Sequence, residues 1–141
     1  MSATVPTASR LVVGLDGHEL LPREGAWLRA HRPAGVILFG RNVRDADQLR
    51  RLCADLRAAL PDGAEIMADQ EGGAVAVLAA AAGRPPSAWT LGSIYDPQLT
   101  RRVHRDTALR ARDCGIDRLL APCADVLLAP GNSVIGSRAF G

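Results

Sequence analysis

The stretch from Gly35 to Leu60, GVILFGRNVRDADQLRRLCADLRAAL, decides the fold class. It opens with a continuous apolar run, Gly35–Phe39, which is typical of a strand that is covered on both faces. From Asp45 onward, apolar residues recur at steps of three and four, which predicts an amphipathic helix with Asp45 as its N-cap. A buried strand followed by such a helix is the repeating unit of an α/β protein.

The same alternation continues on both sides of this unit. Short apolar runs predict further strands at 11–15, 64–68 and 116–122, and the segments 19–31 and 96–114 have the pattern of helices. Strands and helices that alternate with short links form right-handed β-α-β units and a parallel sheet. The sequence therefore predicts an α/β fold with about four parallel strands and intervening helices.

The composition is that of one small soluble domain. The chain has 141 residues, of which 48% are hydrophobic and 23% are charged, and both shares are ordinary for a globular protein. Its 17 basic and 15 acidic residues give a net charge of +2, and they are too dispersed to indicate a nucleic-acid partner. No stretch approaches the ~18 to 20 apolar residues that cross a bilayer, so we expect no membrane contact.

Cysteines, histidines and nucleotide motifs give no sign of a metal or a cofactor. The cysteines are odd in number and lack a C-x-x-C spacing, which argues against disulfides or zinc and favours a reducing compartment. The histidines are scattered without the spacing of metal ligands. The glycine-rich motifs of nucleotide sites are missing. We therefore expect a cytoplasmic protein without a cofactor or a metal.

Polar residues follow each of the four expected strands, at Asp16, Arg41, Asp69 and Asp125. In a parallel sheet the carboxyl ends of the strands face the ligand site. A single acid after a strand is usually a turn or N-cap residue, and we interpret Asp16 in that way. Asp69 is a better functional candidate, because Gly72 and Gly73 let the backbone approach a ligand closely. Glu71 could brace the same loop through backbone N–H groups.

Five motifs carry a resemblance to a known family. In chain order they are GVILFGRNVRDADQLRRL, ADQEGGAVAVL, PSAWTLG, CGIDRLLAPCADV and GNSVIGSRAFG. Their order and spacing resemble the N-terminal domain of family 3 glycoside hydrolases, and most of all the bacterial β-N-acetylglucosaminidase branch, which works in peptidoglycan recycling. The similarity covers residues 11–141 as a partial domain and leaves residues 1–10 as an N-terminal tail. It implies a (β/α)₈ TIM barrel and the retaining hydrolysis of O-glycosyl bonds to terminal β-linked sugars.

The resemblance also suggests roles for individual residues. Asp69 matches an aspartate that binds sugar hydroxyls, and Arg138 matches an arginine that contacts the sugar, where its guanidinium pairs with hydroxyls or braces Asp69. Arg41 is a weaker candidate for the same pocket, and Asp125 matches a residue at the rim. Val77 stands where the family usually has an arginine. The expected ligand is a terminal β-linked sugar of the N-acetylglucosamine or glucose type.

The length of the chain limits what it can do alone. A (β/α)₈ barrel has at least ~200 residues, and the expected strands amount to the N-terminal half of one. In the family, the acid/base histidine and the aspartate nucleophile lie beyond the point that matches Gly141. The resemblance therefore places no catalytic residue in the chain, and we expect the isolated chain to be inactive.

Two other interpretations remain open. The four strands could close as a stand-alone α/β domain that binds a sugar without turnover, or the chain could be an inactive truncated gene product. A half-barrel leaves two open sheet edges, and open edges drive association. We therefore expect self-association or a requirement for a C-terminal half.

Overall fold

Four parallel strands form the central sheet of the structure, a computed structural model that describes residues 7–129 and 131–141. Each strand pairs in parallel with its neighbour in the order β1, β2, β3, β5. This arrangement confirms the predicted α/β class and the four parallel strands. The strands are β1 (Val12–Val13), β2 (Gly35–Leu38), β3 (Glu65–Gly72) and β5 (Arg118–Leu120).

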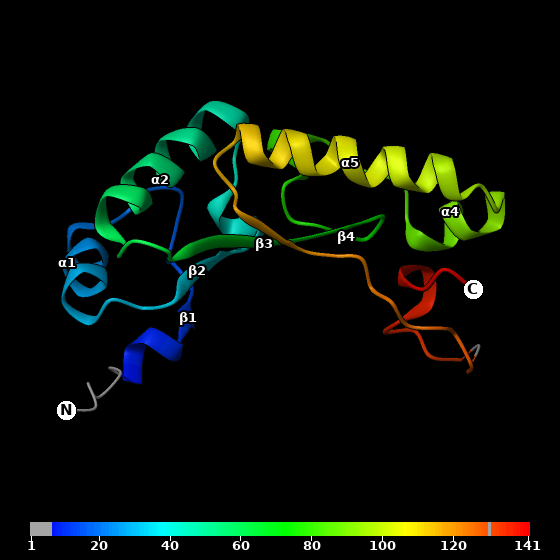
Figure 1. Cartoon of the computed structure of the whole chain (residues 1–141), viewed down its shortest axis with the longest axis horizontal. Coiled ribbons are helices and arrows are strands. Elements are labelled where there is room, and N and C mark those ends of the chain that lie inside the picture. Colours follow the sequence, from blue (N-terminus) through cyan, green and yellow to red (C-terminus); the bar gives the residue numbers. More distant parts are fainter. Residues whose placement is uncertain (1–6, 130) are drawn as a thin grey trace.

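Three helices connect these strands in the predicted places, and they are α1 (Pro22–His31), α2 (Ala46–Ala59) and α5 (Pro97–Asp113). Figure 1 shows α2 and α5 lying along the same side of the sheet. Asp45 caps α2, as predicted, because its carboxylate accepts a hydrogen bond of 2.8 Å from the backbone N–H of Gln48. Asp96 caps α5 in the same way. Such caps satisfy N–H groups that have no partner within the helix.

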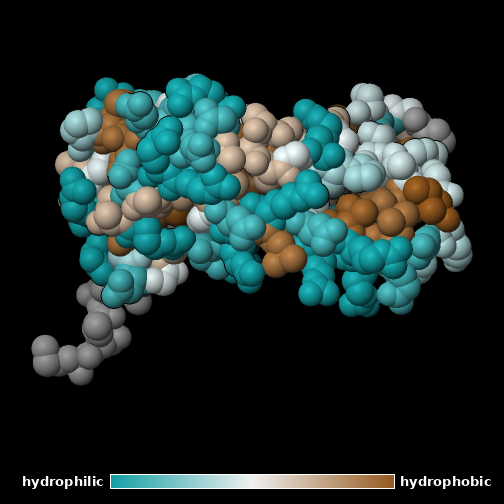
Figure 2. Space-filling model, turned by 90° about the horizontal axis from the view of Figure 1, so that it is seen from above, coloured by the Kyte–Doolittle hydropathy of each residue, from teal (hydrophilic) through white to brown (hydrophobic). Residues whose placement is uncertain are grey.

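The core lies between the sheet and α2. The apolar positions of α2 face the two central strands, while its polar positions face outward, so the surface in Figure 2 is mostly hydrophilic with separate apolar patches. The large side chains of this core are 1% exposed or less, and each contributes about 1.5–3 kcal/mol of burial energy. They are Val36 and Leu38 of β2, Ile66 of β3, and Leu49, Leu52 and Leu56 of α2.

Strand β3 extends beyond the predicted 64–68. It continues through the acidic residues and then turns back into the antiparallel strand β4 (Val75–Ala76). Gly72 and Gly73 make this turn with φ of +106° and +56°, a region that side chains other than glycine rarely adopt. Gln70, 1% exposed, secures the turn by accepting from the N–H of Leu78 at 2.9 Å. Asp69 therefore lies within the strand and not in a loop after it.

Two short helices follow β4, in the segment between the predicted strand 64–68 and the predicted helix 96–114. They are α3 (Ala79–Ala82) and α4 (Ala88–Ile94), and Ser87 caps α4 by accepting from the backbone N–H of Thr90. Three 3-10 turns complete the fold, η1 (Thr7–Arg10), η2 (Gly40–Asn42) and η3 (Gly136–Arg138). The predicted tail 1–10 thus ends in a turn of helix, and its first six residues lie outside the described residues. Of the helices that the structure describes, none is long and apolar enough to cross a membrane.

The segment after β5 returns to α4. Figure 1 shows the C-terminal end lying beneath α4. Gly92 permits this approach, because a Cβ atom at this position would lie 1.8 Å from the carbonyl oxygen of Phe140. The ring of Phe140 also lies 6.4 Å from that of His104 on α5. These contacts hold the C-terminal end against α4 and α5.

Candidate functional site

The candidate site lies where β3 and η3 meet. Asp69 and Glu71 are two residues apart on β3, so their side chains leave the same face of the strand, opposite to the buried Gln70. From η3, Arg138 donates to both carboxylate oxygens of Glu71, each at 2.8 Å. The Arg138 side chain is 29% exposed and that of Glu71 is 11% exposed. This bidentate pair joins parts of the chain that are 67 residues apart.

Arg138 is thus fixed by Glu71 and not by Asp69. The sequence suggested that Arg138 braces Asp69 or that Glu71 braces the loop through backbone N–H groups. In the structure, Arg138 and Glu71 instead pair with each other. The hydrogen bonds from Arg138 to Glu71 raise the pKa of the guanidinium above its usual range, so its charge is permanent.

The carboxylate of Asp69 stands without a partner in the described ranges. Among the residues that the structure describes, no donor forms a hydrogen bond or ion pair with it. Partial burial raises the pKa of Asp69, the negative charge of Glu71 raises it further, and the positive charge of Arg138 lowers it. A carboxylate that is partly desolvated yet unpaired costs free energy, and such groups concentrate at functional sites.

We expect Asp69→Asn to stabilise the fold in a manner that depends on pH. Because the folded pKa of Asp69 lies above its ordinary value, the folded chain binds the proton more tightly, and ionisation of Asp69 opposes folding. The gain from the asparagine should be smallest below pH ~4 and should increase as the pH rises. Urea unfolding over a pH series tests this, with Asp62→Asn at an exposed turn as the matched control. A gain that shrinks with rising pH contradicts the account.

We also expect Glu71 and Arg138 to be coupled energetically. Unfolding of the two alanine variants and of the double variant should give a coupling energy of about 2 kcal/mol, because each single variant leaves a charge without its partner. The control is the pair of Glu65 and Arg118, whose side chains are 34% and 56% exposed. Exposed pairs contribute less than about 1 kcal/mol. Equal coupling in both cycles would show that Glu71 is an ordinary surface partner.

Arg41 reaches a different part of the rim. It follows β2, the strand next to β3, and its Nε donates to the carbonyl of Leu15 at 2.9 Å while the guanidinium lies over the ring of Phe39. Next to it, Asn42 is fully buried and its amide nitrogen donates to Leu15 and Gly17. These contacts tie the ends of β1 and β2 together, and none of them joins Arg41 to Asp69.

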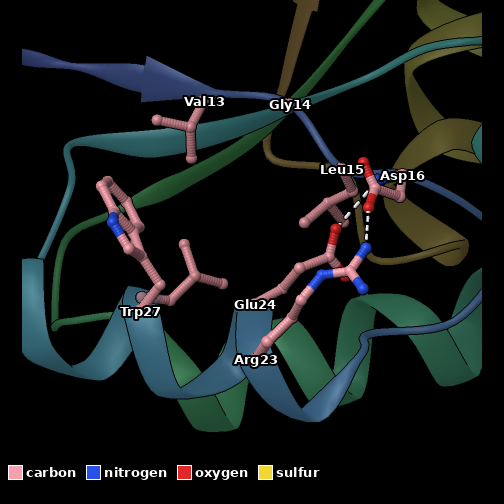
Figure 3. Close-up of a pocket in the computed structure, with 8 residues that line it drawn as sticks. Val13, Gly14, Leu15, Asp16, Arg23, Glu24 and Trp27 are labelled. Carbon is pink, nitrogen blue, oxygen red and sulfur yellow. Dashed lines mark hydrogen bonds and ion pairs between the residues drawn. The ribbon is translucent and has the colours of Figure 1, made fainter.

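Asp125 and Asp16 lie on the two flanks of the site. Asp125 is exposed and accepts from the thiol of Cys123 at 3.3 Å, close enough to Arg138 to favour its positive charge. Asp16 pairs with Arg23 of α1 (Figure 3), and its backbone N–H donates to Glu24. Both of these Asp16 contacts point toward α1.

Val77 replaces a charge with an apolar contact. Its backbone N–H donates to the carbonyl of Asp69 at 3.0 Å, and its side chain packs against the core. The hairpin therefore supplies no cation to Asp69 from this position. Arg138 is the cation that acts on the Asp69 carboxylate.

The site has the chemistry of a polyol receptor. An unpaired carboxylate accepts hydrogen bonds from two hydroxyl groups, and a fixed guanidinium donates to further oxygens. Sequence reasoning identified both residues but missed the bond between Arg138 and Glu71 and the role of Asn42. The only local signal for Asn42 was its place a few residues after a buried strand.

Comparisons with known proteins identify the family to which this fold belongs. The glycosyl hydrolase family 3 N terminal domain matches residues 17–141. A beta-hexosaminidase from Stenotrophomonas maltophilia is 38% identical over 136 residues, which is 92% of this chain and 40% of that protein. The chain therefore spans less than half the length of the curated relative that it matches.

Solved structures agree with this assignment. A family 3 beta-N-acetylglucosaminidase from Paenibacillus superposes with a TM-score of 0.89 at 28% identity, over 95% of this chain and 26% of that one. NagZ from Neisseria gonorrhoeae in complex with N-trifluoroacetyl-D-glucosamine gives a TM-score of 0.79 at 31% identity, over 96% and 42% of the two chains. The described sheet and helices thus match the N-terminal region of these enzymes, and the chain belongs to glycosyl hydrolase family 3.

Proposed function

We propose that this chain supplies part of the sugar-binding subsite of a retaining glycosidase that removes terminal β-linked N-acetylglucosamine. The observation that carries the proposal is the carboxylate of Asp69, which has no partner among the described residues and lies beside Arg138, which Glu71 holds in place. The beta-hexosaminidase relative and the complex of the gonococcal protein with a glucosamine derivative support this sugar class. A cytoplasmic role in peptidoglycan recycling forms part of the same proposal.

Each residue has a separate task in this proposal. Asp69 accepts hydrogen bonds from two neighbouring sugar hydroxyls. A neutral sugar can donate these hydrogen bonds without becoming charged. Arg138 donates to a sugar oxygen, and Glu71 restricts the arginine to one orientation before the sugar arrives. A side chain that is already ordered loses less entropy on binding. Glu71 thereby strengthens the hydrogen bond from Arg138 to the sugar, although Glu71 itself does not contact the sugar.

Titration with N-acetylglucosamine tests this subsite in the isolated chain. The NMR signals of the Asp69 and Arg138 backbone and of the Arg138 guanidinium should shift together and saturate in the millimolar range, which is ordinary for a small neutral ligand. Asp69→Asn should abolish the saturable shifts because asparagine accepts fewer hydroxyl donors. Asp62→Asn should leave them unchanged. Shifts that are the same in the Asp69→Asn variant would contradict the proposal.

A further inference from the structure

Gln70 lies between the two acidic residues of the candidate site, but its side chain leaves the other face of β3. It is 1% exposed and faces the interior, whereas Asp69 and Glu71 are both less buried. Its side-chain oxygen accepts from the N–H of Leu78, and its side-chain nitrogen donates to the carbonyl of Gly83, each at 2.9 Å. A buried amide with two such bonds is costly to remove, because both partners are then left unsatisfied.

The pairing of β3 with β4 is irregular at Glu71. Gln70 pairs with Ala76 and Gly72 pairs with Val75, so two steps along β3 correspond to one step along β4. An irregularity of this kind, a β-bulge, changes the direction of side chains and is common next to active sites. Glu71 is the additional residue, and its carboxylate holds the arginine of the candidate site. The direction of that carboxylate therefore depends on how the hairpin is held.

Residues 83–87, which we call the strap, hold the tip of the hairpin. The N–H of Gly73 donates to the carbonyl of Pro85 at 3.0 Å, and the guanidinium of Arg84 donates to the carbonyl of Gly73. A Cβ atom at Gly73 would lie 2.6 Å from the Cβ of Ser87, so the two segments are in close contact. Figure 1 shows the hairpin extending from the sheet toward α4, which begins directly after the strap.

The strap is supported by α5. A groove of about 210 Å³ runs between them, with Pro85 and Pro86 of the strap and Thr107 and Arg110 of α5 in its lining. Gln70 joins the strap to the chain after β4 on the interior side, and Arg84 joins it to the hairpin tip on the exposed side. The outer strands β1 and β5 take no part in these contacts.

We propose that Gln70 is a positioning residue of the candidate site. By tying the chain after β4 to the strap, it holds the bulge in one form and keeps the carboxylates of Asp69 and Glu71 in place. Gln70 does not contact the sugar, because its side chain lies on the opposite face of β3. A site that is ordered in advance loses less entropy on binding. The effect on sugar affinity rests on the proposed function, whereas the effect on the pair of Glu71 and Arg138 does not.

Gln70→Met tests this role, because methionine has a similar volume but forms neither hydrogen bond. We expect N-acetylglucosamine to bind this variant about tenfold more weakly, and the NMR signals of the Arg138 guanidinium to broaden even without sugar. The matched control is Leu56→Val, which lowers stability by removing part of a core side chain beneath α2. Both readouts should stay as in the parent chain in this control, and urea unfolding measures the stability of each variant.

Two results would overturn the proposal. One is an unchanged sugar affinity or unchanged Arg138 signals in a folded Gln70→Met variant. The other is an equal effect in Leu56→Val, because both readouts would then follow stability alone. If the parent chain binds no N-acetylglucosamine, the proposed function fails, and the sugar-free signals of Arg138 decide the role of Gln70.

The strap offers a second test on exposed residues, which decides the matter if Gln70→Met does not fold. Arg84→Ala removes the bond to the carbonyl of Gly73. We expect it to broaden the Arg138 signals and to weaken sugar binding about threefold. Arg110→Ala is the control, because Arg110 lines the same groove and forms no hydrogen bond with the hairpin in the described ranges. If Arg84→Ala behaves like Arg110→Ala, the strap does not position the site and the proposal is overturned.

Discussion

Replacing Gly72 with alanine is expected to lower the free energy of unfolding by about 3 kcal/mol. Two effects add at this position. The backbone has φ of +106°, and a Cβ atom would lie 2.1 Å from the carbonyl oxygen of Pro86. The atom in the way belongs to the backbone, so a change of rotamer cannot relieve the clash. The hairpin between β3 and β4 would have to move away from the segment before α4.

Gly63→Ala is the matched control for this substitution. Gly63 also has a positive φ, +81°, but a Cβ atom there would meet nothing within 4 Å. Gly63→Ala should therefore lower the free energy of unfolding by about 1 kcal/mol, which is the cost of the backbone conformation alone. Urea unfolding of both variants separates the cost of the positive φ from the cost of the clash with the Pro86 carbonyl. If the two variants lose equal stability, Pro86 does not constrain the hairpin.

The Gly72 variant also reports on the candidate site. Gly72 directly follows Glu71, so a displaced hairpin moves the carboxylate that holds Arg138. We expect the guanidinium signals of Arg138 to broaden or shift in Gly72→Ala and to remain unchanged in Gly63→Ala. The glycine pair that the sequence associated with ligand access thus has a structural task as well. It allows the carboxylates of β3 to stand beside a turn from the far end of the chain.

Local pattern was sufficient to predict the elements with strong periodicity. Helix α2 has an N-cap aspartate and a regular apolar stripe, and β2 is short, apolar and enclosed, so both were predicted within a residue or two. The end of β3 was missed because Asp69, Gln70 and Glu71 resemble a loop in their composition. Tertiary contacts override that preference, since buried Gln70 is satisfied by hydrogen bonds to Leu78 and Gly83.

The sequence proposed the residues of the candidate site but not the contacts between them. Asp69 and Arg138 were identified from motifs, whereas the bond between Arg138 and Glu71 spans 67 residues and has no local signature. The helix α4 was not predicted, because two prolines precede it and a glycine lies within it. The cap at Ser87 and the contact of Gly92 with Phe140 decide that region, and the second of these depends on the course of the C-terminal segment.

The central claim is that these 141 residues supply the sugar-binding part of a β-N-acetylglucosaminidase site. The matched region spans 40% of the Stenotrophomonas relative. The claim can be tested by joining this chain to the part of that protein that follows the matched region. Light scattering and cooperative melting would first establish that the fusion protein is folded. Asp69 should then matter for catalysis, because hydrogen bonds to a charged group hold the sugar in place.

The decisive measurement is kcat/KM of the folded fusion protein for a chromogenic β-N-acetylglucosaminide. We expect turnover well above that of buffer, and we expect Asp69→Ala to lower it on the order of 100-fold while Asp62→Ala leaves it unchanged. A folded fusion protein whose turnover does not depend on Asp69, or one without turnover, would contradict the claim that this chain carries the sugar-binding subsite.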